Sequence, residues 1–524
     1  MRRPTTPRAS RADRASRAPR APRAPRATRA SRALAGALTV LATGAALLAA
    51  PTGPAAAEEP TPGTPAYVAR DLQNVADAYG RITGSGGQLQ NPAYLPALVV
   101  ASTARHVAQM LDQVASPTRL AVTPGNLVPG WNVGNPLRDG WAGTRGRAAR
   151  VAFTNRHGAL LRGTVWAPRP GARDPYTGRP LRGPFPGVVV TPGSVQGSQG
   201  MYEWLAQDLA ERGYVVLTYD VQGQGTSETL PHTTGEAFPG CDPTAAPAGE
   251  ETTGCPGVPS QQLANFTVGT RDALFFLLAT PRRPYANPGS TGAPVQRANP
   301  FWRLLDRRPM ADPWTPGRRT KVAIVGHSLG AAAVSRVQAD DRRVATVVAL
   351  DKLGNGTGGS GPLRPRVPAL AVQSEYGFTV APYALAGGGS IMPQPSPQGP
   401  DPRRERATGW EAWDAAGVDS LLVVPRASTH LEYTDIPLVL PASRWGQAVT
   451  SAYVQRWLDR YLKRRGAPSD LLARSFRYLE PVGEGRWEPV VVRRDPSYQF
   501  CSAFRLSTDR GRVLRDATWT GPAC

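Results

Sequence analysis

The stretch from Lys321 to Ala333 constrains the fold more than any other part of this sequence. It begins with an apolar, β-branched run that predicts a buried strand, and it ends in a run of small residues that predicts the start of a helix. Between them lies Gly-His-Ser-Leu-Gly, residues 326–330. Glycine at both ends of this pentapeptide lets neighbouring backbone pass very close, so the chain is able to turn sharply at Ser328.

A serine on such a turn has its hydroxyl raised clear of the sheet, near the free N–H groups and the positive dipole end of the following helix. The arrangement resembles the nucleophile elbow of the α/β-hydrolase superfamily, in particular its secreted esterase, lipase and dienelactone-hydrolase-like members. The resemblance implies that Ser328 is a nucleophile and that the N–H of Leu329 helps to stabilise an oxyanion. Because the chain contains 55 glycines, an incidental serine in a glycine-rich turn is the alternative.

Two earlier stretches resemble the same superfamily. Residues 187–190 predict a buried strand, and the Thr-Pro-Gly-Ser that follows at 191–194 resembles the loop that supplies the second oxyanion donor. By that resemblance the donor is the N–H of Ser194, although an ordinary turn at a strand end is the alternative. Residues 214–227 read as a strand followed by Asp-x-x-Gly-x-Gly-x-Ser, which resembles the fourth strand of the superfamily at the expected distance before Ser328.

A serine nucleophile needs a base, and the chain has only five histidines. In the superfamily the order along the chain is nucleophile, acid, histidine. His430 follows both Ser328 and the last predicted strand at 420–424, so the resemblance implies that it takes the serine proton. The other histidines come too early, lie in an insertion or adjoin the nucleophile, and they are His106, His157, His232 and His327.

The acid that orients the histidine has two candidates. Glu375 follows the predicted seventh strand at 368–373, which is the usual place for this carboxylate. Asp351 follows the predicted sixth strand at 344–350, a position that some branches of the superfamily use. We favour Glu375 and keep Asp351 as the alternative, because many relatives carry Asp a little further along the loop, where this chain has Gly377.

The order of predicted elements favours the α/β-hydrolase fold, with a mostly parallel central sheet flanked by helices. Residues 150–465 are assigned to this catalytic domain, which opens with a hairpin at 151–166 and closes with an amphipathic helix at 444–463. Residues 58–149 form an N-terminal helical segment with two predicted helices. Residues 466–524 contain short predicted strands and are assigned to a small C-terminal β appendage.

Residues 1–57 have the pattern of an export signal. Arg recurs at every third position through residues 8–32, an apolar run follows at 33–50, and small residues precede a predicted cleavage site after Ala57. We therefore predict a signal peptide and a secreted protein, with a retained membrane anchor as the alternative.

The strong positive charge belongs in part to this leader. Residues 1–57 hold eleven Arg and one Asp, so they account for +10 of the net charge of +22 and leave +12 for the rest. That remainder has neither a clustered basic helix nor a basic stretch interleaved with aromatic residues. Nucleic-acid binding is therefore not expected.

The four cysteines fit an oxidising compartment. They allow three pairings, and the local choice is Cys241 with Cys255 and Cys501 with Cys524. Four buried free thiols are the alternative, which export makes less favourable.

Taken with the resemblance, these features imply a secreted serine hydrolase that cleaves a small-molecule or lipid carboxylic ester through an acyl-enzyme on Ser328. An acyltransferase or peptidase that uses the same triad is the first alternative. A catalytically inactive hydrolase fold that binds a surface is the second. We expect no cofactor and no metal, because no cluster of His, Asp and Cys has ligand spacing. We also expect a monomer with no membrane span after signal cleavage.

Overall fold

The computed structural model describes residues 59–119, 127–128, 131–194, 197–230, 262–310, 319–355, 363–378, 380–388, 394–436 and 442–521. From Glu59 onward the chain forms one compact unit. The predicted export signal lies outside the described residues, so secretion stays a prediction. Within the described ranges, no helix combines the length and the apolar character that a membrane crossing requires.

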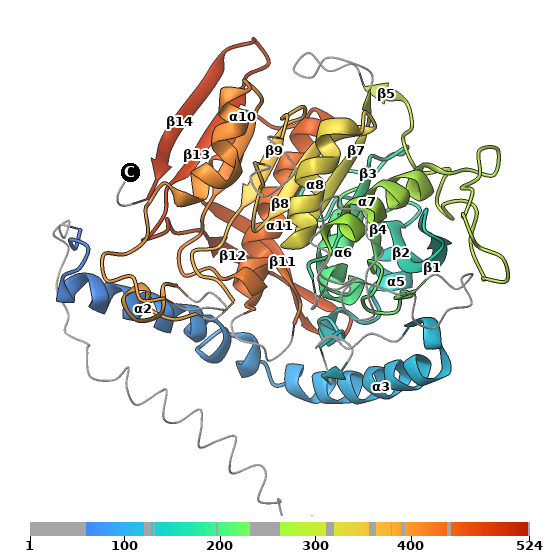
Figure 1. Cartoon of the computed structure of the whole chain (residues 1–524), viewed down its shortest axis with the longest axis horizontal. Helices are drawn as coiled ribbons and strands as arrows, with labels where there is room; N and C mark the ends of the chain where they lie inside the picture. Colours follow the sequence, from blue (N-terminus) through green and yellow to red (C-terminus); the bar gives the residue numbers. More distant parts are fainter. Residues whose placement is uncertain are drawn as a thin grey trace, which may run out of the picture. The chain divides into compact units, whose positions relative to one another are not determined.

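A ten-stranded sheet is the centre of the described part of the chain (Figure 1). In spatial order its strands are β1 (Gly146–Thr154), β2 (Leu160–Pro168), β4 (Val215–Tyr219), β3 (Gly187–Thr191), β7 (Val322–His327), β8 (Val344–Leu350), β9 (Ala369–Val372), β10 (Ser420–Val423), β13 (Ser502–Ser507) and β14 (Val513–Thr520). The six strands from β4 to β10 are parallel, and the two pairs at the edges are antiparallel.

The parallel strands are short, apolar and buried, as the sequence pattern predicts for strands covered on both faces. Register pairs Val189 of β3 with Ile324 of β7, and Val325 of β7 with Val348 of β8. Because the strands are parallel, their carboxyl ends meet at one edge of the sheet. The predicted α/β class with a mostly parallel sheet is confirmed.

Helices cover both faces of the sheet. On one face α7 (Leu263–Leu278) and α8 (Leu329–Asp340) pack against side chains such as Val189. On the other face α6 (Glu203–Glu211) and α11 (Arg444–Lys463) pack against Val188 and Val190. Neighbouring residues of one strand therefore enter opposite cores, which is the two-residue period of a strand.

Two helices precede the sheet, as predicted from residues 58–149. The first, α2 (Pro65–Thr83), begins at Thr64, whose hydroxyl accepts the N–H of Tyr67, and it ends at Gly84. The second is α3 (Tyr94–Ala115). Ala78 of α2 is fully buried in the hydrophobic core of the sheet domain, and α2 contacts α11, so this helix packs on the sheet domain. Shorter helices are α5 (Trp141–Thr144), α9 (Tyr383–Ala386), α10 (Glu411–Ala415), α12 (Pro468–Leu471), the π-helical turn η6 (Arg406–Trp410), and the 3₁₀ turns η1 (Gln88–Gln90), η2 (Pro117–Arg119), η3 (Pro136–Arg138), η4 (Gln199–Tyr202) and η7 (His430–Tyr433).

The C-terminal segment is rich in strands, as its sequence predicts, and half of it belongs to the main sheet. β11 (Ser475–Gly483) and β12 (Arg486–Arg493) form a separate hairpin. β13 instead pairs with β10, with Leu421 opposite Phe504, and β14 pairs with β13. The sequence analysis does not predict β14. A further two-stranded ribbon joins β5 (Pro309–Met310) and β6 (Arg319–Thr320).

Candidate active site

Ser328 lies on the turn between β7 and α8, at the carboxyl edge of the sheet. Its φ of 55° and ψ of −120° lie in a region that non-glycine residues rarely adopt. A methyl group on Gly326 would lie 2.1 Å from the carbonyl oxygen of Gly330. A methyl group on Gly330 would lie 2.3 Å from the carbonyl oxygen of Pro192. Both glycines are therefore required by close backbone approaches, as the pentapeptide predicts.

His430 and Asp351 meet beside this turn. Nδ1 of His430 lies 2.6 Å from Oδ2 of Asp351, and both side chains are largely buried. The N–H of Ser328 donates to the carbonyl of Leu350 over 2.9 Å, which ties the serine to the strand end that carries Asp351. The ring of His430 also lies 4.7 Å from the ring of His327, the residue before the serine. Ser328 after β7, Asp351 after β8 and His430 after β10 thus lie at the same edge of the sheet.

Asp351 is held ionised. Burial alone would raise the pKa of its carboxyl, but the hydrogen bond and charge of His430, with Lys352 and Ser374, outweigh burial and hold the pKa well below its usual range. Oδ2 also accepts the hydroxyl of Ser374 over 2.6 Å, and Oδ1 accepts the Ser374 N–H over 3.2 Å. A fixed carboxylate at Nδ1 places the ring proton there and leaves Nε2 as the proton acceptor.

The preference for Glu375 as the partner of His430 is wrong. Both oxygens of Glu375 are occupied by donors from other parts of the chain. Oε2 accepts the side-chain amide of Asn74 over 2.6 Å and the N–H of Ala427. Oε1 accepts the hydroxyl of Ser497 and the N–H groups of Tyr498 and Gln499. Glu375 thus connects α2, the loop before His430 and the segment before β13, whereas Asp351 contacts the imidazole.

A buried hydrogen-bond chain runs behind the serine. His327 donates from Nε2 to the carbonyl of His430 over 2.9 Å, and its Nδ1 accepts the hydroxyl of Tyr202 over 2.7 Å. Burial lowers the pKa of His327 to about 3, so its ring is neutral and donates from one nitrogen only. The Tyr202 oxygen in turn accepts the N–H of Gly193 over 2.9 Å. This chain connects the loop after β3 with the backbone of His430, and the sequence analysis missed it because Tyr202 belongs to no motif.

The loop after β3 packs directly on Ser328. A methyl group on Gly193 would lie 3.1 Å from Cβ of Ser328. Both backbone groups of Gly193 are engaged, because its N–H donates to Tyr202 and its carbonyl accepts the Gln224 amide over 2.9 Å. The next N–H along this fixed loop is that of Ser194. Leu329 begins α8, so its N–H has no partner within the helix. The roles of Ser194 and Leu329 as oxyanion donors stay predictions.

Residues 214–227, the stretch that resembles the fourth strand of the superfamily, help to hold this loop in place. Asp220 follows β4 and is fully buried, which raises the pKa of its carboxyl. It accepts the Gln199 N–H over 2.6 Å, and the N–H and hydroxyl of Thr226 over 2.8 and 2.7 Å. Its carboxylate therefore organises the turn of residues 221–227 and the approach to α6.

A cavity of about 670 Å³ opens beside the serine. Ser328 and Ala332 form one side of it, and Lys352 to Asn355, after β8, form another. Asp401, Arg404, Ala407 and Thr408 contribute from the segment between α9 and α10. Three of its lining residues are positively charged and belong to no sequence motif: Arg336, Lys352 and Arg404.

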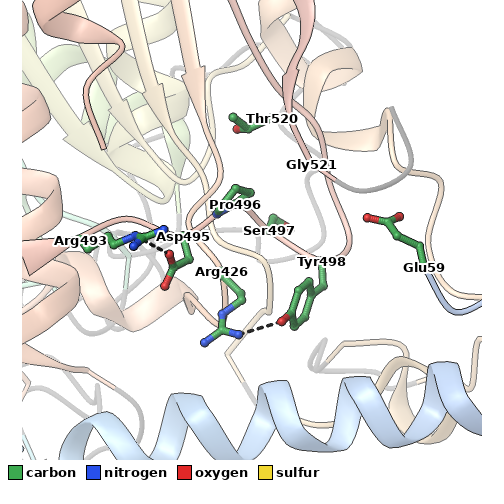
Figure 2. Close-up of a pocket in the computed structure, with 9 residues that line it drawn as sticks. All are labelled: Glu59, Arg426, Arg493, Asp495, Pro496, Ser497, Tyr498, Thr520 and Gly521. Atoms are coloured by element: carbon green, nitrogen blue, oxygen red, sulfur yellow. Dashed lines mark hydrogen bonds and ion pairs between the residues drawn. The ribbon is translucent and has the colours of Figure 1, made fainter. Parts of the chain in front are cut away.

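A second cavity of the same volume lies between the C-terminal segment and Arg426 (Figure 2). Figure 2 shows two interactions among its residues: Arg426 donates to the hydroxyl of Tyr498 over 2.9 Å, and Arg493 lies 3.1 Å from Asp495. Its serine, Ser497, donates to Glu375 and accepts two backbone N–H groups. This hydroxyl is fully engaged, so the cavity beside Ser328 is the better candidate for chemistry.

Metal ligands and cysteines complete the site predictions. Across the residues that the structure describes, no group of three or more His, Cys, Asp and Glu side chains is arranged to hold a metal ion. Cys501 is fully buried. Cys241, Cys255 and Cys524 lie outside the described residues, so both disulfide pairings stay predictions.

Comparison with known proteins gives only weak likenesses, to solved structures. No family model matches the sequence, and no curated protein matches it. Among solved structures, the chain is similar to a ferulic acid esterase from Streptomyces cinnamoneus. The identity is 19%, the TM-score is 0.37, and the match covers 62% of this chain and 92% of that one. We therefore base the function on the geometry of the site alone.

Proposed function

We propose that this protein is a serine hydrolase of the α/β-hydrolase superfamily that cleaves carboxylic esters through an acyl-enzyme on Ser328. The observation that carries the proposal is the 2.6 Å contact between His430 Nδ1 and Asp351 Oδ2 beside a strained serine that lines a cavity. A hydroxyl after β7, a carboxylate after β8 and an imidazole after β10 have the composition and the order along the chain that acyl transfer needs.

In the first half-reaction the Ser328 oxygen attacks the ester carbonyl carbon while its proton moves to Nε2 of His430. Asp351 stabilises the resulting imidazolium. The carbonyl oxygen becomes an oxyanion, which the N–H groups of Ser194 and Leu329 stabilise. The tetrahedral intermediate then collapses: the bond to the alcohol oxygen breaks, and His430 returns the proton to that alcohol as it leaves.

In the second half-reaction a water molecule attacks the acyl carbon and gives a proton to His430. Collapse of the second tetrahedral intermediate breaks the bond to the Ser328 oxygen, which recovers its proton from His430. The acid product leaves and the enzyme is restored. Each step uses side chains and backbone N–H groups of this chain, together with water.

A panel assay tests the proposal. The full chain is incubated with 4-nitrophenyl esters of short and long acyl chains, beside Ser328→Ala as the control. We expect turnover by the unchanged protein and none above background by the variant. A fluorophosphonate probe should label the unchanged protein at Ser328, as mass spectrometry of the peptides would detect. Absence of both labelling and turnover would contradict the proposal and favour an inactive hydrolase fold that binds a surface.

The same panel separates the remaining alternatives. Peptide amides with the same acyl groups test peptidase activity, and added alcohols test acyl transfer through the ratio of ester to acid product. Secretion is proposed on the leader pattern of residues 1–57 alone. Mass spectrometry of protein recovered from culture medium tests it, with a mature N-terminus at Glu58 as the expected result.

A further inference from the structure

The cavity beside Ser328 is lined by more positive than negative charge. Arg336, Lys352 and Arg404 line it, and the one carboxylate among its lining residues is that of Asp401. Asp401 is paired at 3.6 Å with Arg403, which is not part of the lining. The three cations are called the cationic wall below.

Two members of the cationic wall share one buried counter-charge. Oε1 of Glu405 lies 2.7 Å from Nζ of Lys352 and 2.9 Å from Nε of Arg404. The carboxylate of Glu405 is fully buried, whereas the side chains of Lys352 and Arg404 are 37% and 42% exposed. The single negative charge of Glu405 thus contacts two positive charges, whose side chains are partly exposed.

Both groups keep hydrogen-bond donors for a ligand. An ammonium has three N–H donors, and a guanidinium has five in a planar fork. The guanidinium of Arg404 is also held in place, because it lies 4.3 Å from the ring of Phe500 and donates to the Tyr383 hydroxyl over 3.3 Å. Because Lys352 and Arg404 contact the same oxygen atom, one small anion is able to reach both of them.

The position of the cationic wall relates it to the candidate reaction. Lys352 directly follows Asp351, the carboxylate that contacts His430. Arg336 lies two turns after Ser328 on α8, which is roughly 12 Å along the helix axis. An anionic group bound beside Arg336 is therefore several bonds away from an ester carbonyl at Ser328. It binds without taking part in bond breaking.

We propose that the esters cleaved at Ser328 carry a carboxylate, which binds the cationic wall through Lys352 and Arg404. The inference rests on the proposed function and narrows its substrate class. A carboxylate there makes charge-assisted hydrogen bonds that a neutral chain of the same shape does not make. The excess positive charge also attracts anionic substrates before they bind, an effect that salt screens.

Two matched substrate pairs test the inference on the full chain. In the first pair the charge is on the acyl side: 4-nitrophenyl hemiglutarate against 4-nitrophenyl methyl glutarate. In the second it is on the alcohol side: 4-acetoxybenzoate against its methyl ester. We expect kcat/KM to favour the anion by about tenfold or more in at least one pair, with a smaller ratio in high salt. The pair that shows this preference identifies whether the acyl part or the alcohol part of the ester faces the cationic wall.

Variants decide whether the wall causes the preference. Lys352→Gln and Arg404→Gln should each lower the ratio of anionic to neutral kcat/KM several-fold, and Arg404→Lys should recover part of it. Arg486→Gln is the control, since that side chain is 69% exposed and does not line the cavity. Thermal unfolding checks that each variant is folded, and Arg336→Gln replaces any that is not.

The outcomes separate the two proposals. Neutral esters cleaved as well as their anionic partners in both pairs would overturn the substrate inference and leave the proposed function standing. A preference that persists in the folded Lys352 and Arg404 variants would overturn it as well. No turnover of any ester, together with no labelling of Ser328, would overturn both.

Discussion

Replacing Asp351 by Asn should remove nearly all turnover while leaving the fold intact. The reason lies in how Ser374 holds the carboxylate. Its N–H donates to Oδ1 over 3.2 Å, so an asparagine keeps its carbonyl oxygen at that position. The amide NH₂ then faces Nδ1 of His430, which the native carboxylate contacts at 2.6 Å. A donor at this position makes Nδ1 an acceptor and moves the ring proton to Nε2.

The size of the loss follows from this change of tautomer. With its proton on Nε2, His430 is unable to accept the proton of Ser328, and no charge is left to stabilise the imidazolium. An Asp-to-Asn exchange in a Ser-His-Asp triad lowers kcat about 10⁴-fold. That factor corresponds to about 5 kcal/mol of activation free energy. KM should change much less, because Asp351 is buried and does not line the cavity.

The assay is steady-state hydrolysis of a 4-nitrophenyl ester, with thermal unfolding to establish that the variant is folded. Glu375→Gln is the matched control, because Glu375 is the other carboxylate at this edge of the sheet. One oxygen becomes an NH₂ group, so at least two of its five donors lose their acceptor, which should lower stability by about 2 kcal/mol or more. Turnover per folded molecule should stay within roughly tenfold of the unchanged protein, which corresponds to 1.4 kcal/mol. Equal losses of kcat in the two folded variants would refute the assignment of Asp351.

Three further predictions concern the buried groups behind Ser328. Tyr202→Phe leaves the Gly193 N–H and Nδ1 of His327 without their partner. Urea unfolding should therefore report a free energy of unfolding lower by about 1–3 kcal/mol, and kcat should fall by a larger factor than KM changes. Unfolded His327 takes up a proton below pH 6.5 whereas burial holds its folded pKa at about 3, so this residue makes the protein less stable as pH falls from 6.5 toward 3. Between pH 7 and pH 5 the free energy of unfolding should therefore fall by about 2 kcal/mol more in the unchanged protein than in a His327→Gln variant. The same dependence of unfolding free energy on pH in both proteins would contradict the reasoning. Gly330→Ala puts a methyl group 2.3 Å from the Pro192 carbonyl oxygen and should cost about 3 kcal/mol or more, whereas Gly80→Ala, with no atom within 4 Å, should gain about 0.5–1 kcal/mol in the same unfolding assay.

Much of the fold was predictable because its signals are local. The parallel strands are apolar runs such as 187–191 and 322–327, and each is long enough to identify without knowledge of its neighbours. The turn at Ser328 was predictable because its pentapeptide is a local pattern, and Gly326 closely approaches Gly330 only four residues later. The close approach of Gly330 to Pro192 joins distant parts of the chain, and no local pattern records it. The addition of β13 and β14 to the main sheet was not predictable. It depends on an antiparallel pairing of β10 with a strand about 80 residues later, which no local pattern records.

The choice of acid shows where sequence reasoning stops. β8 and β9 are adjacent parallel strands, so Asp351 and Glu375 both reach the edge where His430 lies. The local sequence pattern identifies two candidate carboxylates, and it does not show which of them contacts His430. The difference arises from groups far away in sequence: Asn74, Ala427 and the segment 497–499 occupy Glu375 and leave the imidazole to Asp351. The same holds for Lys352 and Arg404, whose shared contact with Glu405 joins positions about 50 residues apart. The role of such a side chain depends on which distant groups bind to it. The sequence therefore limits the candidate residues, and only the folded structure distinguishes between them.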